Sequence, residues 1–160
     1  LARNNPRLKL VLAGGIGWHS EETLSRIDNS EFKDRIIKTG YISNEEKRTL
    51  LRNARVFVFP SMYEGFGMPV TEAMACGTPC VIANTSSLPE VSLGLAPMVD
   101  KDDAEGFANE IEKMLQTELT PEKKQALVSG GASFSWENAA KVYEMATKYA
   151  LNASKGIGKA

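Results

Sequence analysis

Two glutamates bracket a glycine-containing turn in the segment EGFGMPVTE, which runs from Glu64 to Glu72. Gly65 and Gly67 can adopt backbone conformations that are closed to other residues, and they let a ligand approach the main chain. Pro69 favours the first turn of a helix, whose unsatisfied N–H groups attract a phosphate. The spacing therefore predicts a phosphate held between two carboxylates, each of which accepts hydrogen bonds from hydroxyl groups on either side of it.

A second interpretation of the same segment involves no ligand. Gly-X-Gly turns are common, and a glutamate in the first turn of a helix is often only a favourable partner of the helix dipole. On spacing alone the two interpretations are equally supported. The elements that surround the segment decide where its side chains lie.

The segment belongs to a regular alternation of short apolar stretches and stretches of helical periodicity. Strands are predicted at 8–13, 35–40, 56–60, 79–83 and 96–99. The helix after the second strand begins with the capping-box pair Ser43 and Glu46. This alternation is typical of an α/β domain, with a Rossmann-like parallel sheet and helices on both faces. Ligands bind such sheets beyond the carboxyl ends of the strands, which is where the strand at 56–60 places Glu64.

The carboxyl-terminal part of the chain predicts further helices. The last of them can be capped by Ser135 and carries a stripe typical of a packed helix, formed by Trp136, Ala140, Tyr143, Ala146 and Ala150. The final segment ASKGIGKA has no such pattern. We therefore expect one folded domain over residues 1–152 and a disordered tail over 153–160.

Composition excludes several functional classes. With 160 residues, 42% of them hydrophobic, the chain is large enough to bury a core, and its net charge of −1 argues against a nucleic-acid partner. Cys76 and Cys80 have no histidine nearby, which favours buried thiols in a reducing compartment. His19 lacks companions for a metal site and is expected in a solvent-facing loop. Together with the absence of a membrane-spanning run and of a secretory leader, these features predict a cytoplasmic protein.

The sequence RNARVFVFPSMYEGFGMPVTEAMACGTPCVIANTSSLPEV resembles the signature of the family-4 retaining glycosyltransferases, with their Glu-x7-Glu motif at Glu64 and Glu72. The resemblance is dense over residues 36–92 and extends from LKLVLAGGIGW to FSWENAAKVYEMA. It implies one half of a GT-B architecture, in which two Rossmann-like domains face a cleft. This chain resembles the carboxyl-terminal half, which binds the donor.

The resemblance also implies roles for individual residues. Glu64 corresponds to the catalytic-site acid that faces the transferred sugar, as a positioning group or a nucleophile, and Glu72 to the acid that holds the ribose hydroxyls. The other implied donor-binding residues are Gly14, Gly15, Tyr41, Ile42, Phe66, Gly67, Met68 and Pro69. The two glycines let the donor approach, the segment 66–69 runs over its sugar and phosphates, and residues 41 and 42 lie where the base is read. Packing at the end of a strand is an equal alternative for residues 41 and 42. Trp18 could line the same cleft, but packing on its own helix is the expectation for it.

The activity that the resemblance implies is transfer of a hexose, mannose or glucose, from a nucleoside-diphosphate sugar to a saccharide or lipid-linked acceptor. The anomeric configuration would be retained, as in polysaccharide biosynthesis, and neither a metal nor another cofactor is expected. A lipid-linked acceptor would bring the full-length enzyme to the inner face of the membrane. The alternative is a non-catalytic nucleotide-sugar-binding module that acts as a scaffold or regulatory partner. A nicotinamide-dependent oxidoreductase is disfavoured, because GGIGWHS lacks the third glycine of a dinucleotide loop.

One part of the family pattern has no match in this sequence. Members usually carry an arginine and a lysine before the strand that begins here at Leu8, and LARNNPRLK resembles the end of the helix that would follow them. We therefore expect the first strand of the domain and the acceptor domain to be absent, and the fragment alone to be inactive. That strand is central in a Rossmann order, so its neighbours would have exposed edges. A second copy of the chain could cover them by self-association.

Overall fold

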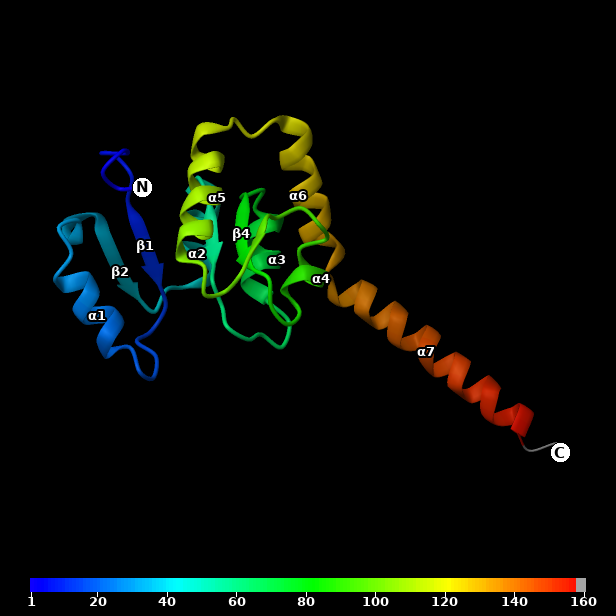
Figure 1. The fold of residues 1–160 in the computed structure, drawn as a ribbon. Coiled ribbons are helices and arrows are strands. Elements are labelled where there is room, and N and C mark those ends of the chain that lie inside the picture. The colour runs from blue at the N-terminus through cyan, green and yellow to red at the C-terminus, as the bar shows by residue number, and fades with distance from the viewer. Residues whose placement is uncertain (158–160) are drawn as a thin grey trace.

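The computed structural model describes the backbone of residues 1–157 and the side chains of residues 1–153. It is an α/β fold in which strands and helices alternate along the chain (Figure 1). The strands are β1 (Leu10–Ala13), β2 (Ile36–Gly40), β3 (Phe57–Phe59), β4 (Cys80–Ala83) and β5 (Met98–Val99). The helices are α1 (Glu21–Asp28), η1 (Lys33–Arg35), α2 (Asn44–Asn53), α3 (Met68–Ala75), α4 (Leu88–Val91), α5 (Ala104–Gln116), α6 (Pro121–Ser133) and α7 (Trp136–Ile157). The predicted alternation is confirmed, with strand ends trimmed by a few residues.

The strands form two parallel sheets. β1 pairs with β2, and β4 lies between β3 and β5, with every pairing in the parallel direction. Within the described residues no strand pairs with the second edge of β1 or of β3. Figure 1 shows β1 on the side of its sheet that is turned toward the three-stranded sheet. The predicted parallel direction is therefore confirmed, but hydrogen bonds do not join the strands into one sheet.

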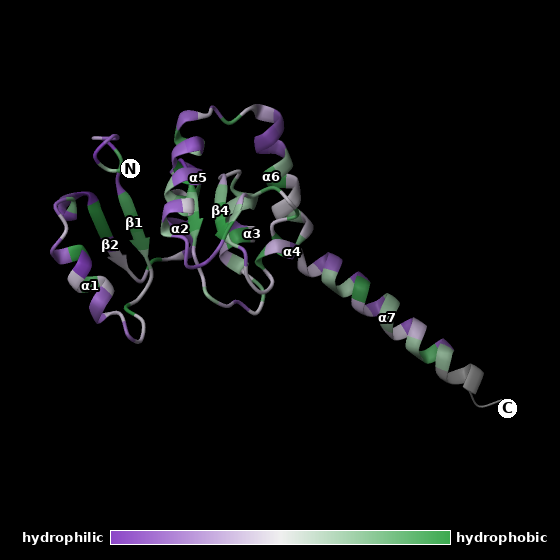
Figure 2. Ribbon diagram, viewed as in Figure 1, coloured by the Kyte–Doolittle hydropathy of each residue, from purple (hydrophilic) through white to green (hydrophobic). Residues whose placement is uncertain are grey.

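The hydrophobic core surrounds the three-stranded sheet. All four residues of β4 are fully buried, and both α3 and α5 contact this strand. Helix α6 packs closely on α3, because a Cβ atom added to Gly131 would lie 2.3 Å from the backbone nitrogen of Ala75. β1 is as apolar as β4 (Figure 2), yet each of its residues is exposed. The sequence pattern thus predicted two strands of similar character, and only one of them is covered.

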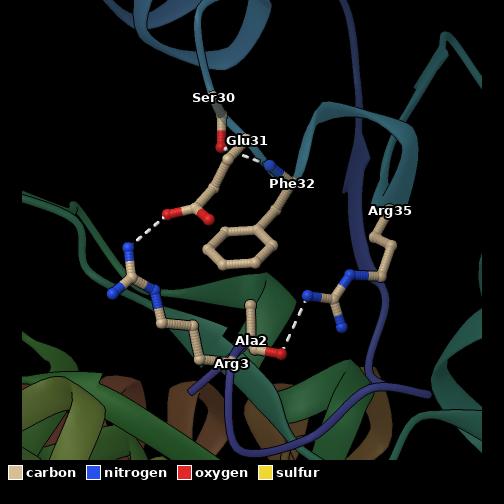
Figure 3. Close-up of polar contacts among 6 residues, drawn as sticks. All are labelled: Ala2, Arg3, Ser30, Glu31, Phe32 and Arg35. Carbon is tan, nitrogen blue, oxygen red and sulfur yellow. Dashed lines mark hydrogen bonds and ion pairs between the residues drawn. The ribbon is translucent and has the colours of Figure 1, made fainter.

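The amino-terminal segment is fixed to the turn before β2 by Arg35 (Figure 3). The Arg35 guanidinium donates hydrogen bonds to the carbonyl oxygens of Ala2 at 2.8 Å, Asn5 at 2.9 Å and Pro6 at 3.0 Å. The central carbon of this guanidinium lies 4.7 Å from the centre of the Phe32 ring. Residues 2–4 and 6–7 form turns, and the amide of Asn5 donates to the carbonyl oxygen of Leu1 at 3.0 Å, the spacing of one helical turn. The end of a helix in LARNNPRLK therefore stays a prediction, and Arg35 pairs with carbonyl groups of the kind that a helix end leaves without an internal partner.

The last helix, α7, projects from the rest of the chain (Figure 1). Ser135 caps its first turn as predicted, accepting a hydrogen bond from the amide of Asn138 at 3.1 Å. The predicted packing of its stripe is wrong, because Trp136 and Tyr143 are 88% and 77% exposed. The helix also continues to Ile157, beyond the predicted domain end at residue 152, and residues 158–160 of the predicted tail lie outside the described residues. Within the described chain, no helix combines the length and the apolar character that a membrane span needs.

Candidate functional site

The loop after β3 places Glu64 beside the loop after β4. The hydroxyl of Ser61 donates to Glu64 Oε1 at 2.8 Å, and the amide of Glu64 donates to Ser86 Oγ at 2.9 Å. Ser87 Oγ donates to the carbonyl oxygen of Phe66 at 2.9 Å, and Thr85 Oγ1 donates to that of Met62 at 3.0 Å. Both loops leave the carboxyl ends of adjacent strands, so these bonds fix the position of the Glu64 carboxylate relative to the sheet.

The hydroxyl residues Thr85, Ser86 and Ser87 connect the two loops, a role that sequence reasoning missed. They form a run of three hydroxyl side chains just after a buried strand, a signal that could have identified them. Ser86 has a left-handed backbone, with φ of 47°, which is uncommon for a residue other than glycine. This conformation belongs to the turn that brings its hydroxyl to the amide of Glu64.

Gly67, directly before α3, has a left-handed backbone conformation of the kind that the sequence predicted. Its φ of 98° lies in the left-handed region, and an added Cβ atom would lie only 2.7 Å from Cδ2 of the buried Leu88. Pro69 occupies the first turn of α3, and no side chain of the described residues caps this end of the helix. Pro69 has no N–H group, and the Val70 amide donates to the Gly67 carbonyl at 2.9 Å. The N–H groups before Pro69 and the helix dipole therefore favour an anion at this point.

The side chains next to this helix start are partly open to solvent. Phe66 is 41% exposed and packs edge-on against Phe134, with ring centres 5.6 Å apart, and Met68 is 55% exposed. Pro69 is half-buried. Phe66 and Met68 thus place partly exposed apolar side chains beside the start of α3, whereas Gly67 between them is buried.

Glu72, on the second turn of α3, pairs with Lys47 from the first turn of α2. The Lys47 Nζ atom lies 2.6 Å from Glu72 Oε1, and the two side chains are 39% and 33% exposed. The start of α2 is fixed by the predicted capping box, in which Ser43 and Glu46 exchange hydrogen bonds. This double hydrogen bond to Ser43 lowers the pKa of Glu46, so the box is complete when that carboxylate is ionised.

The predicted residues of the smaller sheet also lie at the carboxyl ends of their strands. Gly14 has φ of 132° and donates its amide to the Gly40 carbonyl at 3.0 Å, while Gly15 is exposed in the loop that follows. Tyr41 is 93% exposed, so strand-end packing does not hold it, whereas Ile42 is half-buried. No hydrogen bond or ion pair within residues 1–157 connects these four positions to the segment 60–72. The structure places both groups at one end of their strands without bringing them into polar contact.

Two further sequence expectations concern aromatic and titratable residues. Trp18 is 96% exposed, so its predicted packing on the following helix is wrong, and His19 is exposed as predicted. Cys80 is buried and Cys76 half-buried, both as free thiols, and burial raises the pKa of Cys80 to about 12. Among the described residues, no group of three His, Cys, Asp or Glu side chains could hold a metal ion.

A cavity of about 380 Å³ lies at the opposite, amino ends of β3 and β4, lined by Arg52, Arg55, Thr78 and Lys124 among others. It contains none of the predicted site residues. The two glutamates of the candidate site lie outside this cavity, and both are half-buried. Glu64 and Glu72 each have one carboxylate oxygen held by a protein donor, and among the described residues no side chain donates to the second oxygen, which can accept hydrogen bonds from a ligand.

Comparison with known proteins relates the chain to one family. The family model described as glycosyl transferases group 1 matches residues 1–134. O-antigen chain mannosyltransferase B of Escherichia coli is 36% identical over 133 residues, which cover 82% of this chain and 35% of that protein. D-inositol 3-phosphate glycosyltransferase of Mycolicibacterium smegmatis is 33% identical over 137 residues, covering 82% and 31%. The chain thus spans about a third of the length of these relatives.

Two solved structures have a fold similar to that of this chain. Sucrose-phosphate synthase from Thermosynechococcus elongatus superposes with a TM-score of 0.70 at 29% identity, covering 94% of this chain and 40% of that one. The Anabaena protein HepE, solved in complex with UDP and glucose, superposes with a TM-score of 0.71 over 93% of this chain and 42% of its own. Its identity of 18% supports a common fold only.

Proposed function

The chain belongs to the group 1 glycosyl transferases, and on that premise we propose that it binds the nucleotide-sugar donor of a hexosyltransferase. As part of a longer enzyme it would serve transfer of the hexose to a saccharide or lipid-linked acceptor, with retention at the anomeric carbon. The acceptor would be bound by a second domain. A lipid-linked acceptor would bring the enzyme to the cytoplasmic face of a membrane.

The observation that carries this proposal is the position of Glu64 and Glu72 on either side of the uncapped start of α3. The helix start favours the diphosphate, since its N–H groups and dipole are directed at that point. Glu72 would accept hydrogen bonds from the ribose, and Glu64 from the sugar. Negative charge that develops on the leaving phosphate would be stabilised by the same N–H groups, without need of a metal or another cofactor.

The first test concerns the ribose and the identity of the nucleotide. We expect one of UDP, GDP and ADP to raise the melting temperature of this chain selectively, and Glu72→Ala to abolish the shift. The names of the mannosyltransferase relatives favour mannose as the hexose, and the titration identifies the nucleotide that carries it. No shift with any of these nucleotides, or with their hexose conjugates, would contradict the donor site.

The second test concerns Glu64 in the full-length enzyme. Its carboxylate is oriented by Ser61, and its amide by Ser86, so Glu64→Gln removes charge without removing these bonds. We expect turnover to fall by at least about tenfold, which is ~1.4 kcal/mol in the activation barrier. Glu105→Gln, at the exposed first turn of α5, is the matched control. Unchanged turnover in Glu64→Gln would refute its role, and absence of turnover in the wild type would favour a non-catalytic module.

We also propose that one further parallel strand completes the sheet between β1 and β3, supplied by sequence outside these 160 residues. Leu10, Val11 and Leu12 of β1 are 49%, 39% and 36% exposed, although the strand is wholly apolar. Phe57 donates its amide to the Pro79 carbonyl at 2.8 Å, so the alternation of a strand turns the amide of Val58 toward the open edge. The relatives are more than twice as long as this chain and can provide such a strand.

Amide exchange measured by NMR tests the missing strand. In this chain the amide of Val58 is expected to exchange quickly and that of Phe57 slowly, because only the latter is paired. In the longer polypeptide both should exchange slowly. Protection of Val58 that grows with the concentration of this chain would instead place a second copy at the edge. Fast exchange of Val58 in the longer polypeptide would contradict the proposal.

A further inference from the structure

Lys47 is the one cation of the described residues that forms an ion pair with either acid of the candidate site. We infer that Lys47 is a positioning residue for Glu72 and makes the site selective for a nucleotide with an intact ribose diol. This inference rests on the proposed donor site. Neither the spacing of the two acids nor the family resemblance singled out Lys47, because it lies 25 residues before its partner.

The position of Lys47 is set by the start of α2. The Ser43 side chain accepts a hydrogen bond from the Glu46 amide at 3.2 Å, and Glu46 Oε2 accepts one from the Ser43 amide at 2.8 Å. The Lys47 amide donates to the Ser43 carbonyl at 2.9 Å, which closes the first helical turn. Since α2 follows the carboxyl end of β2, this turn carries Lys47 to the end of the sheets where the donor would bind.

The ion pair leaves both partners with free hydrogen-bonding capacity. Lys47 Nζ contacts Glu72 Oε1, and no other side-chain hydrogen bond to Glu72 exists within the described residues. The second carboxylate oxygen can therefore accept from a hydroxyl group. An ammonium group has three donors, so two remain for an acceptor beside it. The pair thus presents an acceptor and a donor side by side, the arrangement that a pair of adjacent hydroxyl groups can satisfy.

Because the Lys47–Glu72 ion pair is partly exposed, its effect on ligand binding can be distinguished from its effect on folding stability. Ion pairs that are about one third exposed are screened by water and contribute little to stability. A carboxylate held at one oxygen, however, loses less side-chain freedom when a ligand binds, and that preorganisation increases affinity. Removal of the ammonium group should therefore weaken ligand binding more than it changes folding.

The experiment compares Lys47→Met with wild type in calorimetric titrations of this chain. The probes are UDP, GDP and ADP, each beside its 2′,3′-dideoxy counterpart. We expect Lys47→Met to weaken binding of the preferred ribonucleotide by about tenfold, the effect of one hydrogen bond to a charged group, and to leave the dideoxynucleotide within about twofold. Lys141→Met, which removes a more exposed ion pair with Glu137 on α7, is the control for loss of a lysine charge.

The outcomes distinguish the inference from the function on which it rests. If wild type binds none of the nucleotides, the donor site is overturned and the role of Lys47 with it. If Glu72→Gln weakens ribonucleotide binding and Lys47→Met does not, only the inference is overturned. Equal losses for the ribonucleotide and its dideoxy counterpart in Lys47→Met would also overturn it, because they indicate general attraction of the diphosphate.

Discussion

Replacement of Gly67 by alanine tests the local geometry from which α3 and its anion site are built. The residue has φ of 98°, and a Cβ atom would lie 2.7 Å from Cδ2 of Leu88, whose side chain is fully buried. The left-handed conformation costs a non-glycine residue about 1–2 kcal/mol, and overpacking of a core position adds about 1–3 kcal/mol. We therefore expect Gly67→Ala to lower the free energy of unfolding by about 2–5 kcal/mol.

Urea denaturation followed by circular dichroism is the appropriate assay. Tryptophan fluorescence is a poor probe, because Trp18 and Trp136 are already 96% and 88% exposed in the folded chain. Gly65→Ala is the matched control. A Cβ atom at Gly65 meets nothing within 4 Å, and its φ is not in the left-handed region. The control should stay within about 0.5 kcal/mol of wild type.

A second substitution separates the two causes. Leu88→Ala removes the side chain that the new Cβ atom would meet, at its own cost of about 2–5 kcal/mol. In that background Gly67→Ala should cost only the backbone contribution of about 1–2 kcal/mol. If Gly67→Ala and Gly65→Ala are equally tolerated in the wild-type background, the reasoning about both the conformation and the contact is wrong.

Three further predictions concern the core. In the folded chain at pH 8, iodoacetamide should modify the half-buried Cys76 and leave Cys80 intact, because burial raises the pKa of Cys80 to about 12. Equal modification of the two thiols in peptide mass spectra would contradict this prediction. Since the unfolded chain releases that proton first, the free energy of unfolding should fall as pH rises from about 9 towards about 12, and Cys80→Ala should reduce this slope in urea titrations. Gly131→Ala should destabilise the chain by at least about 2 kcal/mol in the same assay, because its Cβ atom would lie 2.3 Å from the Ala75 backbone nitrogen; near-native stability would show that α3 and α6 can separate.

The sequence by itself determined the features that depend on neighbours along the chain. Alternating apolar and helical stretches indicated the α/β class and the succession of strands and helices along the chain, because side-chain periodicity follows directly from backbone geometry. The capping box of Ser43 and Glu46 and the left-handed glycine before Pro69 were predictable for the same reason. The resemblance assigned the chain to a known family, and the family model confirmed that family. The roles that it implies for Glu64 and Glu72 stay predictions.

Only the tertiary structure decided which distant groups meet and which apolar surfaces are covered. Ser86 reaches the amide of Glu64 across 22 residues, and Lys47 reaches Glu72 across 25, because loops from different strands and helices converge at one end of the sheet. The equally apolar strands β1 and β4 differ in burial, since periodicity specifies a face that prefers to be covered but not the partner that covers it. For α7 the same reasoning predicted a packed helix, and the described chain leaves its aromatic side chains exposed to solvent. A side chain is buried only where another part of the fold packs against it, and the sequence of a single helix or strand does not specify that part.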